Sequence, residues 1–163
     1  MKIGIFSDVH NNVSNLQQAF DSMHAMGCRH FIFLGDITTP MTLQAMVNMC
    51  NGLPIDILPG NNDFSYGDLR YMVTAENVTF HRDPAVIRRY GLNFALSHTK
   101  ALASNTRTND IIDIVLYGHT HVAEKSISNG ILYANPGELQ GRTGLCSFAV
   151  LNTDSVSLEH YFL

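Results

Sequence analysis

The chain has 163 residues, of which 45% are hydrophobic and 15% are charged, and its formal net charge is −4. This length corresponds to one domain on the usual scale of about 100–200 residues, so we expect a single domain over residues 1–163. The composition is that of a folded chain rather than a disordered one. A net acidic chain with scattered bases lacks the dense cationic face that nucleic acids and anionic membranes require, so neither partner is expected.

The apolar runs of the chain are short, and none approaches the roughly 20 residues needed to cross a bilayer. The first residues lead directly into one such run without the pattern of a secretory signal. The three cysteines, Cys28, Cys50 and Cys146, contain no C-x-x-C pair and suit small buried hydrophobes in a reducing compartment. Together these features predict a cytoplasmic protein.

The first third of the chain alternates short apolar runs with helical periodicity. The runs at residues 3–6, 31–34 and 55–58 suit strands that are buried on both faces. Apolar residues at i, i+3, i+4 and i+7 predict a helix over 14–26, with Ser14 as N-cap and Gly27 as the stop, and a second helix after Pro40. This β-α-β-α-β order favours parallel strands.

The remainder of the chain reads mainly as hairpins. Three pairs of short runs flank turn residues, at 86–90 with 93–96, at 125–127 with 131–134, and at 147–151 with 156–158. A further apolar run at 114–117 predicts one more strand. A chain that first alternates strands with helices and then forms hairpins indicates two facing sheets with helices outside.

Polar residues follow the predicted strands at the points where these end. Strand ends are where open α/β folds display functional groups, and residues i and i+2 of an extended chain point the same way. Carboxylate, imidazole and amide ligands together suit Mn, Fe, Co, Ni or Zn. The motifs are Asp8-Val9-His10, Gly35-Asp36, Gly60-Asn61-Asn62-Asp63, Ser97-His98 and Gly118-His119-Thr120-His121.

Taken singly, these motifs carry little information. D-x-H and Gly-Asp arise often by chance, Asn61 suits a turn, and two histidines near a strand end suit a solvated loop. Five such motifs occur in one order, each directly after an apolar run, and the packing of a protein core does not require such a pattern. The set as a whole therefore favours a metal site.

The ordered set D-x-H, G-D, G-N-x-D, H and G-H-x-H resembles that of the calcineurin-like metallophosphoesterases, and most of all their small YfcE-like phosphodiesterase branch, from Asp8 to about Gly137. The resemblance implies an α/β fold, a four-layer α/β/β/α sandwich of two mixed sheets. It also implies a small phosphodiester substrate and two divalent ions, Mn²⁺ first, with Zn²⁺, Ni²⁺, Co²⁺ and Fe²⁺ as alternatives. By similarity, one ion is held by Asp8, His10, Asp36 and His121, and the other by Asp36, Asn61, His98 and His119.

The implied chemistry agrees with the properties of these residues. Asp36 would bridge the ions, because a carboxylate has two oxygens and two-metal sites hold their ions about 3.5–4 Å apart. A hydroxide bridging the ions would attack phosphorus in line while the ions neutralise charge on the phosphoryl oxygens. The segment Gly141-Arg142-Thr143-Gly144 is interpreted as a loop that enters the last hairpin, since the chain has no G-x-x-x-x-G-K-[ST] loop.

The sequence departs from the wider family directly after Asn61. Many relatives have a histidine there that is thought to protonate the leaving group, whereas this chain has Asn62. An amide cannot act as a general acid, so we expect slow turnover, biased toward diesters with good leaving groups. Asp63 would orient its neighbours, although a turn residue is the simpler interpretation. Asn62 and Asp63 are the candidate catalytic residues.

Three residues besides Asn62 bear on substrate binding. Glu138 replaces the serine of the family's N-P-G-S loop, so it either points away from phosphate or limits anionic substrates. Arg142 and Lys100 are candidates to contact the substrate, as is Asn62. Solvated surface charges explain the two cations equally well.

Two other functions would suit the same fold. A non-catalytic protein-binding scaffold, similar to the retromer subunit, would tolerate the loss of histidine at Asn62, but the seven filled ligand positions favour an enzyme. A phosphomonoesterase or nucleotide hydrolase would use the same ions and is not separated from a diesterase by the sequence. A thiol enzyme is disfavoured because no cysteine neighbours a histidine. The oligomeric state stays open, with a homo-oligomer among the alternatives.

Overall fold

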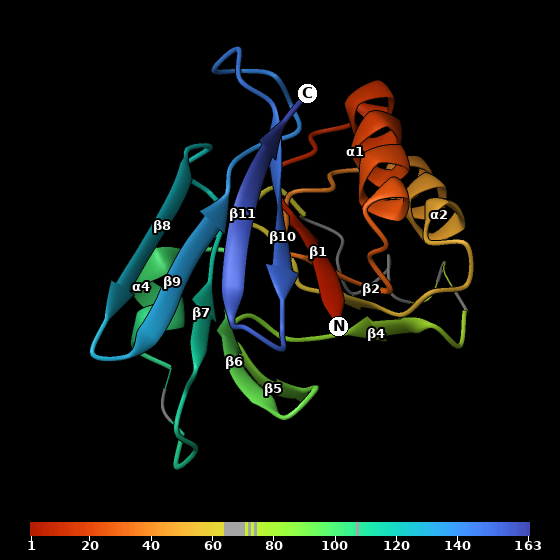
Figure 1. The fold of residues 1–163 in the computed structure, drawn as a ribbon. Helices are drawn as coiled ribbons and strands as arrows, with labels where there is room; N and C mark the ends of the chain where they lie inside the picture. Colours follow the sequence, from red (N-terminus) through yellow and green to blue (C-terminus); the bar gives the residue numbers. More distant parts are fainter. Residues whose placement is uncertain (64–70, 72, 74, 107) are drawn as a thin grey trace.

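The computed structural model describes residues 1–63, 71, 73, 75–106 and 108–163. In this part of the chain, strands form two mixed sheets that are flanked by helices (Figure 1). The elements in chain order are β1 (Lys2–Phe6), α1 (Val13–Ala25), β2 (His30–Phe33), α2 (Pro40–Met49), β3 (Ile55–Ile57), β4 (Val78–Phe80), β5 (Ala85–Arg89), β6 (Leu92–Leu96), α4 (Lys100–Ser104), β7 (Ile114–Leu116), β8 (Ala123–Ser128), β9 (Ile131–Pro136), β10 (Ser147–Asn152) and β11 (Ser157–Phe162).

Both sheets combine a parallel centre with antiparallel strands. Among the described residues, the first sheet has six strands in the order β11-β10-β1-β2-β3-β4, and the second has five in the order β5-β6-β7-β9-β8. β1, β2, β3 and β4 pair in parallel, as do β6, β7 and β9. The pairs β5–β6, β8–β9 and β10–β11 are antiparallel. The predicted parallel strands and the predicted hairpins are thus confirmed.

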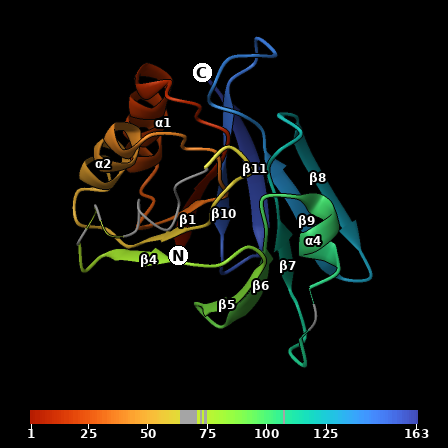
Figure 2. The same ribbon diagram turned by 180° about the vertical axis from the view of Figure 1, so that it is seen from behind.

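The layers follow from alternation along the strands. In β2, Phe31 and Phe33 pack with the apolar stripes of α1 and α2, whereas Ile32 points into the core between the two sheets. On the other side, Ala103 of α4 packs against Val115 on the outer face of the five-stranded sheet. Figure 2 shows α1 and α2 on one side of the molecule and α4 on the other. The predicted four-layer α/β/β/α sandwich is confirmed.

The start of α1 differs from the prediction. The helix begins at Val13, and its N-cap is Asn12, whose Oδ1 accepts a hydrogen bond of 3.1 Å from the backbone N of Asn15. The choice of Ser14 was wrong because an asparagine already caps the helix two residues earlier. The side chain of Asn12 also donates to the carbonyl of Gln140 at 2.9 Å, which fixes the helix start against the 137–146 loop. Gly27 follows the helix with φ of 81°, as its role as the stop requires.

Two short elements gave no usable signal in the sequence. β4 has three residues and pairs in parallel with β3, and α4 has five residues that follow Thr99. Neither is long enough to show a periodicity. None of the helices in the described ranges has both the length and the hydropathy needed to span a bilayer.

Candidate metal centre

The predicted ligands meet where the parallel strands of the two sheets end. A cavity of about 370 Å³ opens there, and His10, Asp36, Asn61, His119 and His121 line it. Asp8 and His98 are buried, at 0% and 1% exposure, and contact the lining residues His10 and Asp36. The structure therefore brings six of the seven predicted ligands into direct contact with one another, and places Asn61 at the same cavity.

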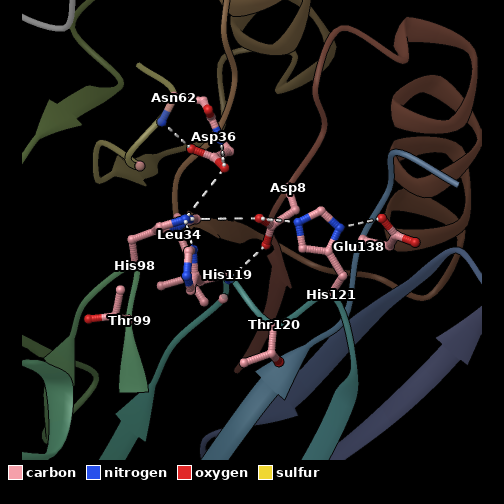
Figure 3. A network of polar contacts seen from close by, with 12 residues as sticks. Asp8, Leu34, Asp36, Asn62, His98, Thr99, His119, Thr120, His121 and Glu138 are labelled. Carbon is pink, nitrogen blue, oxygen red and sulfur yellow. Dashed lines mark hydrogen bonds and ion pairs between the residues drawn. The ribbon is translucent and has the colours of Figure 1, made fainter. Parts of the chain in front are cut away.

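The two carboxylates are the centre of this cluster (Figure 3). Asp36 Oδ2 lies 3.2 Å from Nε2 of His10 and 3.5 Å from Nε2 of His98. Asp8 Oδ1 lies 3.3 Å from Nε2 of His121, while Asp8 Oδ2 accepts a 3.0 Å hydrogen bond from the backbone N of His119. Each carboxylate thus has one oxygen facing imidazole nitrogens.

Two of these imidazoles are held with Nε2 toward the carboxylates. His98 Nδ1 is 2.7 Å from the carbonyl of Leu34, and His121 Nδ1 is 2.6 Å from Oε2 of Glu138. Since both partners are acceptors, Nδ1 carries the proton, and in the neutral ring Nε2 presents a lone pair. Lone pairs on nitrogen and carboxylate oxygen repel each other, so their convergence suits a cation between them.

Unsatisfied atoms support the same interpretation. Asp8 Oδ1 and His10 Nε2 are buried without a well-aligned hydrogen-bond partner in the part of the chain that the structure describes, and buried polar atoms seldom remain so. Ligand atoms lie within 4.8 Å of one another in two groups, Asp8 with His10 and His121, and Asp8 with Asp36 and His98. Mixed nitrogen and carboxylate oxygen donors suit divalent transition metals. The residues therefore fit such ions.

The carboxylates and imidazoles of the cluster shift one another's pKa values. The pKa of His10 is raised to about 9, chiefly because Asp36 can accept its proton and secondly because Asp8 can. For Asp36, burial alone would raise the pKa, but the contacts with His10 and His98 and the backbone N–H of Asn62 outweigh it and hold the pKa well below its usual range. A proton on His10 and a metal ion compete for the same lone pair.

The backbone around the ligands is unusual. Five predicted ligands have positive φ, namely Asp8 (53°), His10 (41°), Asp36 (65°), His119 (70°) and His121 (62°). Residues with a Cβ rarely adopt this region, and those that do gather at functional sites. Hydrogen bonds join the loop that follows β1 to the loop that follows β2. The backbone N of Asp8 donates to the carbonyl of Gly35 at 3.0 Å, and the backbone N of His10 donates to the carbonyl of Asp36 at 3.0 Å.

Gly60 is needed for close packing beside Asp36. A Cβ at Gly60 would collide with both Oδ1 and the backbone N of Asp36. The glycine of the G-N-x-D motif therefore lets the two strand ends approach each other.

Asn62 and Asp63 both act on Asp36. Asn62 donates to the two oxygens of this carboxylate, from its backbone N at 2.8 Å and from its side-chain Nδ2 at 2.7 Å. The buried carboxylate of Asp63 accepts from the backbone N–H groups of Asp36 (2.9 Å), Thr38 (2.8 Å) and Gly60 (2.7 Å). Burial nevertheless raises the pKa of Asp63.

The two predicted substrate-binding cations lie in different places. Arg142 lines the cavity. Lys100 does not, because it begins α4 on the outer side of the five-stranded sheet, where its ammonium group bonds to Glu124 and lies 5.1 Å from the ring centre of Tyr117. The structure therefore brings Arg142, but not Lys100, to the predicted ligands.

Glu138 has a partner that the sequence did not reveal. It is fully buried, its Oε2 contacts His121, and its Oε1 accepts from the backbone N and from Oγ1 of Thr143, the latter at 2.7 Å. It does not line the cavity, which agrees with the alternative in which it points away from phosphate. Thr120 and Thr143 also line the cavity; both lie in segments noted in the sequence, but neither was expected to be a site residue.

Comparison with known proteins agrees with this geometry. Phosphodiesterase MJ0936 of Methanocaldococcus jannaschii is 27% identical over 160 residues, which cover 94% of each chain. A solved archaeal phosphodiesterase is 26% identical, covers 100% of both chains and superimposes with a TM-score of 0.90. The phosphoesterase YfcE of E. coli, at 16% identity and 99% and 98% coverage, has a TM-score of 0.75.

The fold is also shared with Vps29 of Entamoeba histolytica, which is 16% identical, covers 100% of this chain and 99% of its own, and has a TM-score of 0.64. The family model described as the calcineurin-like phosphoesterase superfamily domain matches residues 1–156, almost the whole chain. The chain therefore belongs to the calcineurin-like phosphoesterase superfamily, and it is a hydrolase of phosphate esters.

Proposed function

We propose that this protein is a phosphodiesterase that depends on two divalent metal ions. The observation that carries the proposal is the convergence of imidazole Nε2 atoms and carboxylate oxygens around Asp8 and Asp36. The similarity over nearly the full chain to a curated phosphodiesterase and to a solved archaeal phosphodiesterase structure supports a diester as the substrate. The absence of paired cysteines among Cys28, Cys50 and Cys146 in the described structure suits action in the reducing cytoplasm.

Seven residues would hold the ions, in the two sets that the family resemblance implies. Asp36 suits the bridging role, because its Oδ2 faces His10 of one set and His98 of the other. Two ions held there, with Mn²⁺ first among the candidates, would activate water for in-line attack on phosphorus and neutralise charge on the phosphoryl oxygens. The sets are Asp8, His10, Asp36 and His121, and Asp36, Asn61, His98 and His119.

The remaining residues position these ligands or the substrate. Asn62 and Asp63 fix the side chain and the backbone of Asp36, and Arg142 lies where it can pair with the phosphate charge. Asn62 cannot donate a catalytic proton, since an amide has no suitable pKa. Turnover therefore depends on substrates whose leaving groups depart without protonation.

The test is hydrolysis of bis-p-nitrophenyl phosphate by metal-stripped protein, with and without added Mn²⁺, beside the Asp36→Ala variant. We expect activity that needs the metal and that is lost in the variant. Parallel assays with p-nitrophenyl phosphate separate a diesterase from a phosphomonoesterase. A wild-type protein that binds two ions but hydrolyses neither ester would instead be a protein-binding scaffold.

A further inference from the structure

A second cavity of about 290 Å³ adjoins the candidate metal centre. His121 and Thr143 line both cavities, so the two are neighbours across these residues. The second one is otherwise lined by the side chains of Val122, Ala123, Leu145, Ser147 and Phe162. In Figure 1 the start of β8, the end of β11 and the loop between β9 and β10 lie at the same end of the molecule.

This cavity is apolar and open to solvent. Val122, Leu145 and Phe162 are 58%, 66% and 60% exposed, although large apolar side chains are normally covered. An apolar hollow beside a polar reaction centre is typical of small-molecule sites, in which a few polar groups fix the orientation of a mostly apolar ligand.

The polar atoms that line the second cavity are already engaged. Ser147 Oγ donates to the carbonyl of Pro136 at 2.7 Å, and Thr143 Oγ1 donates to Glu138 at 2.7 Å. Apart from His121, none of the described residues that line it has an ionisable side chain. A second phosphate, a carboxylate or a sugar would find few free hydrogen-bond donors there. An uncharged ring needs few such donors, so it would give up few hydrogen bonds on entering.

We propose that this cavity binds an uncharged aryl or heteroaryl substituent of the phosphodiester while the phosphate lies at the neighbouring ligand cluster. The proposal rests on the proposed function, because it takes the phosphate to be bound beside His121. The substrate class is then a diester with at least one planar, apolar organic group. Such a group would cover Leu145 and Phe162, whose exposure otherwise costs free energy.

The test compares the binding of two non-activated diesters with the same charge, diphenyl phosphate and dimethyl phosphate, by titration calorimetry of the Mn²⁺-loaded protein. We expect diphenyl phosphate to bind roughly tenfold more tightly, in proportion to the apolar area that it buries. Leu145→Ser and Phe162→Ser should each remove several-fold of this preference and leave the binding of dimethyl phosphate unchanged. Both side chains are exposed, so neither change threatens the fold. Ile111→Ser is the control, because Ile111 is 83% exposed and lines neither cavity.

Three outcomes would overturn the proposal. The first is equal binding of the two diesters or no binding of diphenyl phosphate, and the second is an equal loss for both ligands in the variants. The third is a wild-type dimer that Leu145→Ser converts to a monomer without any change in ligand preference, since a second copy would then be what covers the cavity. Hydrolysis of methyl p-nitrophenyl phosphate, measured separately, reports on the proposed function alone.

Discussion

The buried Glu138 and the partly buried His121 form a carboxylate–imidazole pair in which Oε2 and Nδ1 are 2.6 Å apart. Burial alone would raise the pKa of Glu138, but the hydrogen bonds from Thr143 and His121 outweigh it and lower the pKa. A carboxylate in this position holds the imidazole in one orientation and strengthens its other nitrogen as a ligand. The same carboxylate fixes Thr143, so it links a predicted metal ligand to the loop that carries Arg142.

The first prediction concerns this pair. Glu138→Gln should weaken Mn²⁺ binding about 10- to 100-fold, since partners of metal-bound histidines typically have effects of this size. Calorimetric titration of the metal-stripped protein with Mn²⁺ measures the change. Glu124→Gln is the matched control, because Glu124 pairs with Lys100 away from the cavity. Unchanged affinity in Glu138→Gln would show that His121 needs no support.

The second prediction separates two roles of Asn62. Since its Nδ2 contacts Asp36 and no proton can be transferred, Asn62→Ala should lower kcat about tenfold, with the same pH profile and the same dependence on leaving group. The measurement is hydrolysis of aryl diesters of graded leaving-group pKa across the pH range. A loss of ~10²–10⁴ that is confined to poor leaving groups would indicate proton transfer and contradict the positioning role.

The third prediction concerns the stability of the metal-free protein. Asp63→Asn replaces an acceptor by an amide among three backbone N–H donors, which leaves at least one of them without a partner. We expect the free energy of unfolding to fall by about 1–3 kcal/mol, as measured by urea denaturation. Asp110→Asn, at an exposed position, should change it little. If both variants unfold alike, the three hydrogen bonds contribute nothing net.

The fourth prediction concerns acid stability. Asp56 of β3 is fully buried, with His30 Nε2 at 2.8 Å, His81 Nε2 at 2.7 Å and Arg89 Nη2 at 2.6 Å from its carboxylate. Burial alone would raise the pKa of Asp56, but these partners outweigh it and hold the pKa well below the ordinary 3.8. A depressed carboxyl pKa stabilises the folded state above the unfolded-state pKa, and this contribution is lost as the pH falls toward the folded-state pKa.

Asp56→Asn should therefore destabilise the protein at pH 7, by about 1–3 kcal/mol, because the donors around position 56 then face a neutral amide instead of a carboxylate. The difference from wild type should shrink as the pH falls below about 4, the range in which a free aspartate takes up its proton. Urea unfolding of both proteins at pH 7 and pH 3 tests this. A difference that is equal at the two pH values would rule out the charge as its source.

Much of the fold could be predicted because local patterns determined it. The apolar runs at β1, β2 and β3 are buried on both faces, and the hairpins have turn residues at their tips, so both follow from periodicity and turn chemistry. The start of α1 could not be placed, since Asn12 and Ser14 are both good caps and the contact of Asn12 with Gln140 is 128 residues away in sequence. β4 is defined only by its pairing with β3.

The candidate site shows the same limit. The predicted ligand positions follow strand ends, which the sequence reveals, whereas the partner of Glu138 depends on where the 137–146 loop folds. Lys100 was a candidate by charge alone, and only the position of α4 shows that it lies with Glu124. The second cavity joins residues from the start of β8, the end of β11 and a loop, so no motif could have indicated it.

The left-handed backbone at Asp8, His10, Asp36, His119 and His121 means that the candidate metal centre reduces the stability of the fold. Each such residue costs on the order of 1–3 kcal/mol, whereas glycine adopts the same φ without penalty. His119→Gly or His121→Gly should therefore stabilise the metal-free protein while removing a predicted ligand. Design for thermal stability alone would replace these residues first, so engineering of the protein must keep all five unchanged.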